Sequence, residues 1–210
     1  MADSPTSRSV KIDQDERGGW SSDRPRPGGG PARPADVAVR GRALAPSNLL
    51  RYSPGSLVVV VSGSAEAREA LVARVVDDQG SVLSSAKVRA LLAGRGIEDD
   101  DRAAQILDAA VGKRLTEGNS VTLVADGVTA DERERYVRMA AANRRPRHLV
   151  LVEAPRDQIA EDDHDELNAL RRALDAGTLG GEGFSTFLRL GGSALAELKR
   201  LVYRAPQQDD

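Results

Sequence analysis

Short runs of consecutive apolar residues recur along the chain and are separated by segments in which apolar residues have helical spacing. The three clearest runs are rich in Val and Leu and lie at Leu57–Val61, Val121–Val124 and 149–152. Because these runs are apolar at every position rather than at alternate ones, they are typical of parallel strands that are buried on both faces. The pattern predicts a sheet at the centre of an α/β fold.

The segments between and after these runs carry apolar residues mostly on one side of a helix. They predict helices over 65–76, 86–92, a longer segment that opens on the acids at 98–101, 129–143 and 165–174. Thr129 and Glu132 have the spacing of a capping box. A short strand over 184–190 and a closing helix over 194–203 follow. This alternation predicts a three-layer α/β sandwich with a mainly parallel sheet.

The first part of the chain lacks this pattern. Residues 1–54 are rich in Pro, Gly and Arg, and they bury too little apolar surface to offset the entropy of ordering a backbone. We expect a disordered tail over 1–54, one folded domain over 55–204 and a short disordered tail over 205–210. Trp20 is the exception in the first tail, because a lone Trp can anchor a partner.

Composition narrows the classes of function. The chain has no Cys, which excludes disulfides and thiolate metal sites, and His148 and His164 lack metal-ligand spacing, so we expect no metal site. No apolar run is long enough to span a bilayer, so we expect a cytoplasmic protein without a membrane partner. Residues 1–56 are mildly basic and the remainder is acidic, which argues against a folded domain that grips nucleic acid by charge.

The eight residues Ser62–Glu69 lie where a phosphate-binding loop is expected, directly after the first strand and before a helical run. A Walker A loop has Gly at the first and sixth of its eight positions, Lys at the seventh, and Ser or Thr at the eighth. This chain has Ser62, Ala67, Arg68 and Glu69 at those positions. The placement indicates a nucleotide site, whereas the residue types depart from the pattern.

Five motifs in order make the segment from about 57 to 190 resemble the polynucleotide kinase-like branch of P-loop kinases, the 5'-hydroxyl kinases. They are the loop at 62–69 and the stretches at 83–92, 121–129, 153–155 and 182–184. The resemblance implies a P-loop kinase-like fold and ATP with magnesium as the cofactor of an active member. It also makes Ser62, Gly63, Ser64, Ala67, Arg68 and Glu69 remnants of a nucleotide site.

The same resemblance assigns roles to residues outside the loop. The family's general base, an Asp, corresponds to Ala86, so that base is absent from its place. Arg89 matches an Arg that holds the acceptor, and Asp126 matches an Asp at the end of a strand, which makes both catalytic remnants. Each has an ordinary alternative, since Arg89 can be a solvent-facing helix charge and Asp126 can form a turn with Gly127.

The family closes an Arg-rich lid over the phosphates, but the corresponding stretch here, 156–166, is mostly acidic. Acids there would repel a polyphosphate, whereas they would suit the start of the following helix.

Three hypotheses about function follow. The chain is a catalytically inactive kinase-like domain that binds an unidentified protein partner or a ligand; or an ATP-binding phosphotransferase with rearranged residues; or a nucleic-acid-binding adaptor that uses its tail. We favour the first.

Overall fold

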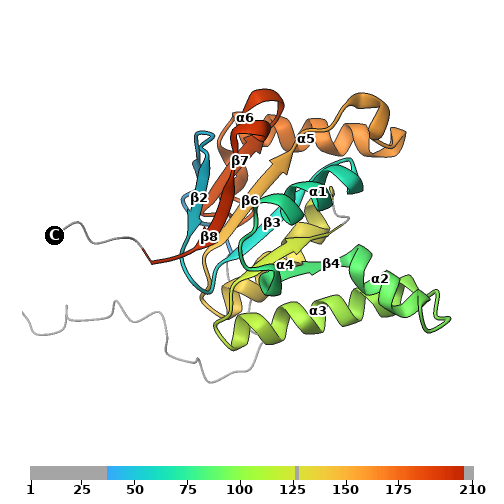
Figure 1. Cartoon of the computed structure of the whole chain (residues 1–210). Coiled ribbons are helices and arrows are strands. Elements are labelled where there is room, and N and C mark those ends of the chain that lie inside the picture. The colour runs from blue at the N-terminus through green and yellow to red at the C-terminus, as the bar shows by residue number, and fades with distance from the viewer. Residues whose placement is uncertain (1–36, 126–127, 206–210) are drawn as a thin grey trace, which may run out of the picture. The chain divides into compact units, whose positions relative to one another are not determined.

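A six-stranded parallel sheet is the centre of the computed structural model, which describes residues 37–125 and 128–205. Its strand order is β1-β7-β6-β3-β5-β4. Figure 1 labels β7, β6, β3 and β4 of this sheet. In this order the strands span β1 Arg42–Ala43, β7 Thr186–Leu190, β6 Arg147–Val152, β3 Leu57–Val61, β5 Val121–Val124 and β4 Val82–Ser84. The strands predicted from the three apolar runs are confirmed as β3, β5 and β6, and they are neighbours at the centre of the sheet.

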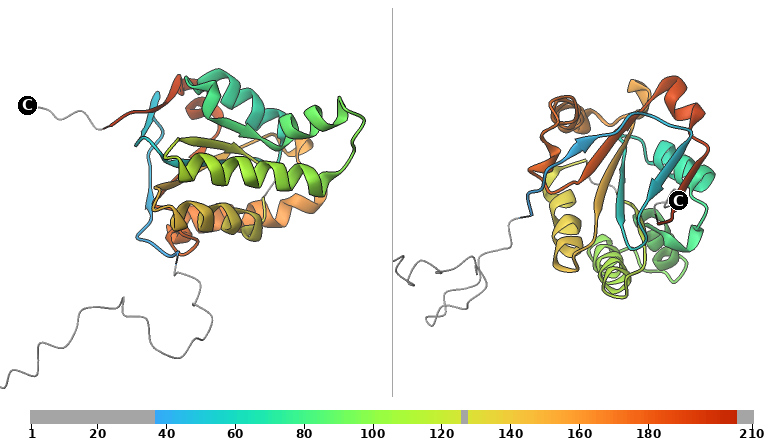
Figure 2. Two further views of the ribbon diagram at one scale, coloured as in Figure 1. Left: turned by 90° about the horizontal axis from the view of Figure 1, so that it is seen from below. Right: turned by 90° about the vertical axis from the view of Figure 1, so that its left-hand side faces the viewer.

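Helices connect the strands and cover both faces of the sheet (Figure 2). The α-helices are α1 Ala65–Val75, α2 Ser85–Ala93, α3 Asp100–Thr116, α4 Ala130–Ala142, α5 His164–Asp175 and α6 Gly192–Glu197. Short 3-10 helices lie at η2 Gln79–Ser81, η3 Arg156–Gln158, η4 Glu161–Asp163 and η5 Thr178–Gly180. None of the helices in the described part of the chain is both long enough and apolar enough to cross a membrane.

Alternate residues of β3 point to two separate hydrophobic cores. Leu57, Val59 and Val61 pack in the core that includes residues of α3, α4 and α5. Val58 and Val60 pack in the core that includes α1 and the residues after α6. Because both faces are covered, all five residues of β3 are buried, which explains why its sequence is continuously apolar. The expected three-layer α/β architecture is confirmed.

The register of the central strands brings three loops to one edge of the sheet. Leu57 of β3 lies opposite Val121 of β5 and Arg147 of β6, and all these pairs are parallel. The carboxyl ends of the three strands are therefore neighbours. In open parallel sheets this edge is where ligands usually bind. Three segments start at this edge of the sheet. They are the loop from Ser62, the residues after β5, and the segment from Glu153 after β6.

A second, two-stranded parallel sheet pairs β2 (Leu49–Tyr52) with β8 (Arg200–Tyr203). Two expectations are therefore corrected. Strands β1 and β2 lie within 1–54, which we expected to be disordered, and the predicted closing helix over 194–203 ends early and gives way to β8. The physical reason is pairing between distant segments, since Leu50 and Tyr52 are buried in the same core as Leu201. Residues 1–36, with Trp20, and 206–210 lie outside the described part.

Helix α4 begins where the capping-box pattern predicts, with Thr129 at the N-cap position. The Thr129 side chain nevertheless makes no capping hydrogen bond, so this part of the expectation is wrong. Thr129 and Glu132 are both exposed, and water competes there for the same donors. Acids still precede or begin several helices, with Asp99 capping α3 and Asp165 and Glu166 in the first turn of α5.

Candidate functional site

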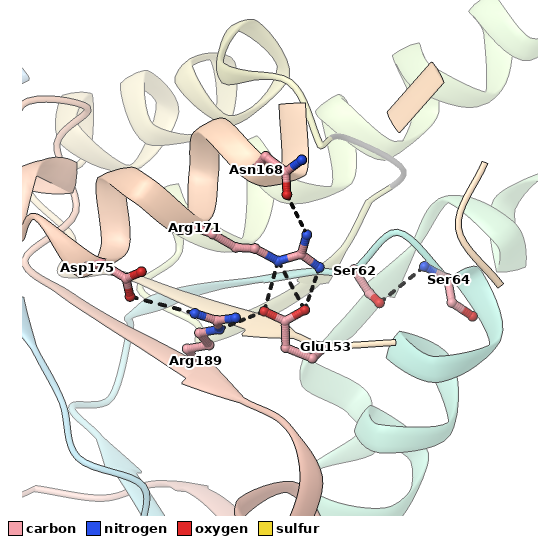
Figure 3. Close-up of polar contacts among 7 residues, drawn as sticks. All are labelled: Ser62, Ser64, Glu153, Asn168, Arg171, Asp175 and Arg189. Atoms are coloured by element: carbon pink, nitrogen blue, oxygen red, sulfur yellow. Dashed lines mark hydrogen bonds and ion pairs between the residues drawn. The ribbon is translucent and has the colours of Figure 1, made fainter. Parts of the chain in front are cut away.

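The loop after β3 is short, because α1 begins at Ala65, within the eight-residue stretch that we compared with a phosphate loop. Ser62 is buried, and its Oγ accepts a hydrogen bond from the backbone N–H of Ser64 at 3.1 Å (Figure 3). The Oγ of Ser64 caps the helix by accepting from the N–H of Ala67 at 3.2 Å. Two backbone N–H groups of this stretch are thus bound by its own serines.

Arg68 points back into the protein from the first turns of α1. Its side chain is buried, with the residue only 5% exposed, and its Nη1 donates to the carbonyl oxygen of Ser62 at 3.0 Å. The backbone N–H of Arg68 donates to the carbonyl of Ser64 at 3.3 Å, which is an ordinary helical bond. The guanidinium therefore stabilises the loop that precedes its own helix.

Glu69 contacts the start of α2. One of its carboxylate oxygens accepts a hydrogen bond from the Oγ of Ser84, and Ser84 also caps α2 by accepting from the N–H of Lys87 at 3.2 Å. The Walker A pattern has a hydroxyl that binds magnesium at the position of Glu69. In this chain the carboxylate instead links two helices through a capping serine.

Apolar side chains cover Gly63 in the middle of the loop. A Cβ atom built on Gly63 would lie 2.6 Å from Cδ1 of Leu167 in α5 and 2.9 Å from Cγ2 of Ile159. A side chain at this position would therefore require Leu167 and Ile159 to shift, because their aliphatic carbons pack directly on Gly63. Ile159 belongs to the acidic stretch at 156–166 that corresponds to the family's lid.

These contacts decide whether a magnesium-bound triphosphate fits the loop. A phosphate cradle needs several unengaged backbone N–H groups and a close approach at glycine. Here the N–H groups of Ser64, Ala67 and Arg68 are engaged within the protein, and aliphatic carbons lie against Gly63. The residues present do not fit the group.

The other positions that the resemblance singled out are Ala86, Arg89 and Asp126. Ala86 is exposed on the first turn of α2. The Nε of Arg89 contacts Oδ1 of Asp100 in α3 at 2.7 Å. Asp126 lies outside the described residues. A small cavity of about 90 Å³ between α2, α3 and α4 is lined by Arg89, Asp100 and eight further residues, and Ala125 at the end of β5 is one of them.

A charged network that the sequence did not reveal lies at the carboxyl ends of β6 and β7 (Figure 3). Glu153 accepts hydrogen bonds from Arg171 of α5, at 3.1 Å to Oε1, and from Nε of Arg189 of β7 at 2.6 Å. Arg189 also contacts Asp175 at 3.6 Å, and Arg171 donates to Asn168 at 2.9 Å. The network fixes α5 against two strands.

The network also sets the charge of Glu153. Burial disfavours its ionised form, but the hydrogen bonds and charges of Arg171 and Arg189 outweigh burial and lower the pKa of this carboxyl group. The hydrogen bond to Glu153 raises the pKa of Arg171 in turn. Glu153 was part of a sequence motif, but its partners lie far along the chain, and no local pattern identifies them.

A pocket of about 740 Å³ lies beside this network, over the start of α5. Its lining comes mainly from the acidic stretch and α5, and consists of Ala154, Arg156, Ile159, Glu161, Asp162, His164, Asp165, Asn168 and Arg171. The pocket is therefore mixed in charge with three carboxylates at its rim, which does not suit a polyphosphate. In the described part of the chain, no group of three His, Asp or Glu side chains has the arrangement of a metal site.

The chain was compared with known families and proteins. A family model described as an AAA domain matches residues 52–169, which is more than half of the chain. The chain belongs to this AAA domain family. The family is one of P-loop kinase-like domains and includes polynucleotide kinase-like proteins, so the kinase-like family expected from the motifs is confirmed at that level. The comparison with curated proteins found no relative.

The match to the AAA domain runs from Tyr52, the last residue of β2, into α5 and so includes the loop, β4 and the acidic stretch. The 5'-hydroxyl kinase branch stays a prediction.

The sequence identified the position of the loop in the AAA domain, but it did not identify the residues that contact the loop, which are Ser84, Ile159 and Leu167. Ser84 stood in a quoted motif and is the only one of the three with a local signal, since a Ser before a helical run is a typical N-cap.

Proposed function

We propose that this AAA domain is a catalytically inactive kinase-like domain that acts by binding a protein partner. The observation that carries the proposal is the engagement of the loop by its own protein: Arg68 hydrogen-bonds to Ser62, and Ile159 lies against Gly63. Phosphoryl transfer depends on positioning and charge stabilisation by the loop and by magnesium. A loop whose polar groups are internally bonded and whose glycine is covered offers neither.

The substitution of the general base supports the same conclusion independently. Ala86 cannot accept a proton, and its side chain is exposed at the start of α2. The loss of one such group typically lowers the rate of transfer by orders of magnitude, and here several of these positions are substituted. The competing hypothesis of an ATP-binding phosphotransferase requires new residues to supply all of these roles. The adaptor hypothesis concerns residues 1–36, which the structure does not describe.

A nucleotide titration tests the proposal. A ligand at a hundredfold excess over its Kd stabilises a folded protein by about 2.7 kcal/mol, which raises the Tm of a domain of this size by roughly 5–10 °C. We expect no such shift with millimolar ATP or ADP and magnesium. We also expect no transfer of the γ-phosphate to a 5'-hydroxyl oligonucleotide.

Two variants make the outcome specific. Arg68→Ala removes the loop arginine, and Arg138→Ala removes an exposed arginine of α4 that pairs with Glu134. A nucleotide-dependent shift or phosphate transfer that Arg68→Ala abolishes and Arg138→Ala retains would overturn the proposal in favour of the ATP-binding alternative. Binding of an oligonucleotide that weakens steeply with salt would favour the adaptor.

A further inference from the structure

Two large aliphatic side chains on neighbouring helices are left in solvent at one end of the sheet. Leu91 of α2 is 70% exposed and Ile106 of α3 is 42% exposed, and in the described residues these are the exposed large hydrophobic side chains. The two helices pack against each other beside the edge strand β4 (Figure 1). Single exposed leucines are common, but a pair that shares one surface needs an explanation.

A small pocket lies between the two helices. Its volume is about 150 Å³, and it is lined by Val88, Leu91, Leu92, Arg95 and Ile106. Four of these residues are aliphatic. The pocket has the size and chemistry to receive one aliphatic side chain of a partner, which is how small apolar pockets commonly anchor a binding helix.

Cations flank the aliphatic pair. Lys87 lies four residues before Leu91 in α2, and Arg102 lies four residues before Ile106 in α3, spacings that bring side chains to the same side of a helix. Arg95 follows the end of α2 and lines the pocket itself. All three are exposed, and none forms an ion pair with another described residue. We call Lys87, Leu91, Arg95, Arg102 and Ile106 the α2–α3 surface.

Two of the acids at the start of α3 have other roles. Asp99 caps α3 by accepting from the backbone N–H of Arg102 at 2.8 Å, and Asp100 pairs with Arg89 at 2.7 Å. Together with Glu98 they line a separate cavity of about 190 Å³ at the connection between the helices. Asp101, next to Arg102, is a further exposed acid in the first turn of α3, whereas the charged residue among those that line the aliphatic pocket is Arg95.

We infer that the α2–α3 surface binds an acidic amphipathic peptide segment, with an aliphatic side chain in the pocket and carboxylates facing Lys87, Arg95 and Arg102. This names the partner class of the function proposed above and rests on that proposal. Complementary charge gives specificity and speeds association, while the apolar contact supplies most of the affinity. A second copy of the chain fits less well, because a two-fold pairing centred on Leu91 places cations opposite cations.

The test uses the full chain and two labelled helical peptides of about 16 residues, long enough for appreciable helix content. One carries Leu at positions i and i+4 flanked by Glu, and the matched peptide replaces each Glu with Lys. By fluorescence anisotropy, we expect the acidic peptide to bind at least roughly tenfold more tightly than the basic one. Leu91→Ser should weaken binding of the acidic peptide by roughly tenfold or more.

Charge variants test whether the peptide binds at this surface or responds only to the net charge of the protein. The double variant Lys87→Glu and Arg95→Glu should strongly weaken binding of the acidic peptide. The control double variant Arg144→Glu and Lys199→Glu changes the net charge equally at exposed positions elsewhere and should leave binding of that peptide intact. Equal binding of both peptides, no binding of either, or insensitivity to Leu91→Ser would overturn the inference. A dimer in sedimentation that Leu91→Ser dissociates would assign the surface to self-association instead.

The nucleotide titration and transfer assay are read separately from these experiments. If neither peptide binds, the proposed loss of phosphoryl transfer is unaffected. Active transfer would overturn that proposal whether or not the peptides bind.

Discussion

Arg68 and Glu69 are charged side chains that contact the protein itself rather than a ligand. Arg68 contacts the carbonyl of Ser62, and Glu69 accepts from Ser84 at the start of α2. Hydrogen bonds to charged groups contribute about 1.5–3 kcal/mol each when they are protected from water. The two charges therefore hold the beginning of α1 against the loop before it and the helix after it, which is a structural use of positions that the Walker A pattern reserves for nucleotide contacts.

His148 is the buried titratable residue with the clearest effect on stability. Its Nδ1 lies 2.8 Å from Oγ1 of Thr186, and its ring packs on that of Tyr52 with centroids 4.4 Å apart. Its Nε2 has no hydrogen-bond partner among the described residues. Burial disfavours the charged ring and lowers the pKa of His148 to about 4.

This shift makes the protein sensitive to acid. Between pH 6.5 and 4 the unfolded chain binds a proton at His148 that the folded protein excludes, so stability falls as the pH falls through this range. From pH 7 to pH 5 the loss from this residue is about 2 kcal/mol. We expect His148→Gln, which does not titrate, to reduce the pH dependence of the free energy of unfolding by that amount, as measured by urea denaturation. An unchanged pH dependence would contradict the assignment.

At the scale of elements, the segment that leads into β1 is held by close contact between backbones. The N–H of Val39 donates to the carbonyl of Gly180 in η5 at 2.8 Å. A Cβ atom on Gly180 would lie 2.4 Å from the carbonyl oxygen of Val39 and 2.5 Å from the backbone nitrogen of Gly41. Backbone atoms cannot move aside as a flexible side chain can, so the attachment of β1 depends on glycine at this position.

Gly180→Ala should therefore push the 37–44 segment away from η5 and lower the free energy of unfolding by about 1–3 kcal/mol, the usual range for overpacking. Gly112→Ala is the matched control, because Gly112 lies inside α3 and nothing is within 4 Å of an added Cβ. There the same change should stabilise the protein by about 0.5–1 kcal/mol. Urea denaturation of both variants tests this, and equal effects at the two positions would refute it.

Sequence patterns revealed the elements whose signals are local. Strand β3 is continuously apolar because it is buried on both faces, and α3 follows a helical pattern that opens on acids. Strands β2 and β8 were missed because each mixes buried with exposed residues and pairs with the other, far along the chain. The same limit applies to the loop: its position could be predicted, but its contact with Leu167 depends on how α5 packs, which no local pattern contains.

Across the whole molecule, burial is uneven. All five residues of β3 are buried, whereas α2 buries only Leu92 and α6 buries none of its six residues. Elements with few buried side chains open with little loss of free energy, and their backbone amides exchange with solvent through local rather than global unfolding. The rate of amide exchange should therefore differ between the centre of the sheet and α2, the helix that carries Leu91.

Hydrogen exchange measured by mass spectrometry should therefore give the slowest amides in β3, β5 and β6 and much faster exchange in α2. The acidic peptide should slow exchange in α2 and leave β3 unchanged. If α2 in the protein alone exchanged as slowly as β3, the exposed face of α2 would be covered in solution, and the expected order of stability would be wrong.

The two ends of the six-stranded sheet have a consequence for how the protein behaves when concentrated. One edge strand, β1, has two residues and the other, β4, has three and passes directly into α2. Long edge strands present rows of unpaired amides and carbonyls that recruit strands from other molecules. Edges this short leave few positions for such growth, so the six-stranded sheet is protected from polymerisation even though its strands are parallel and its central strands β3, β5 and β6 are fully buried.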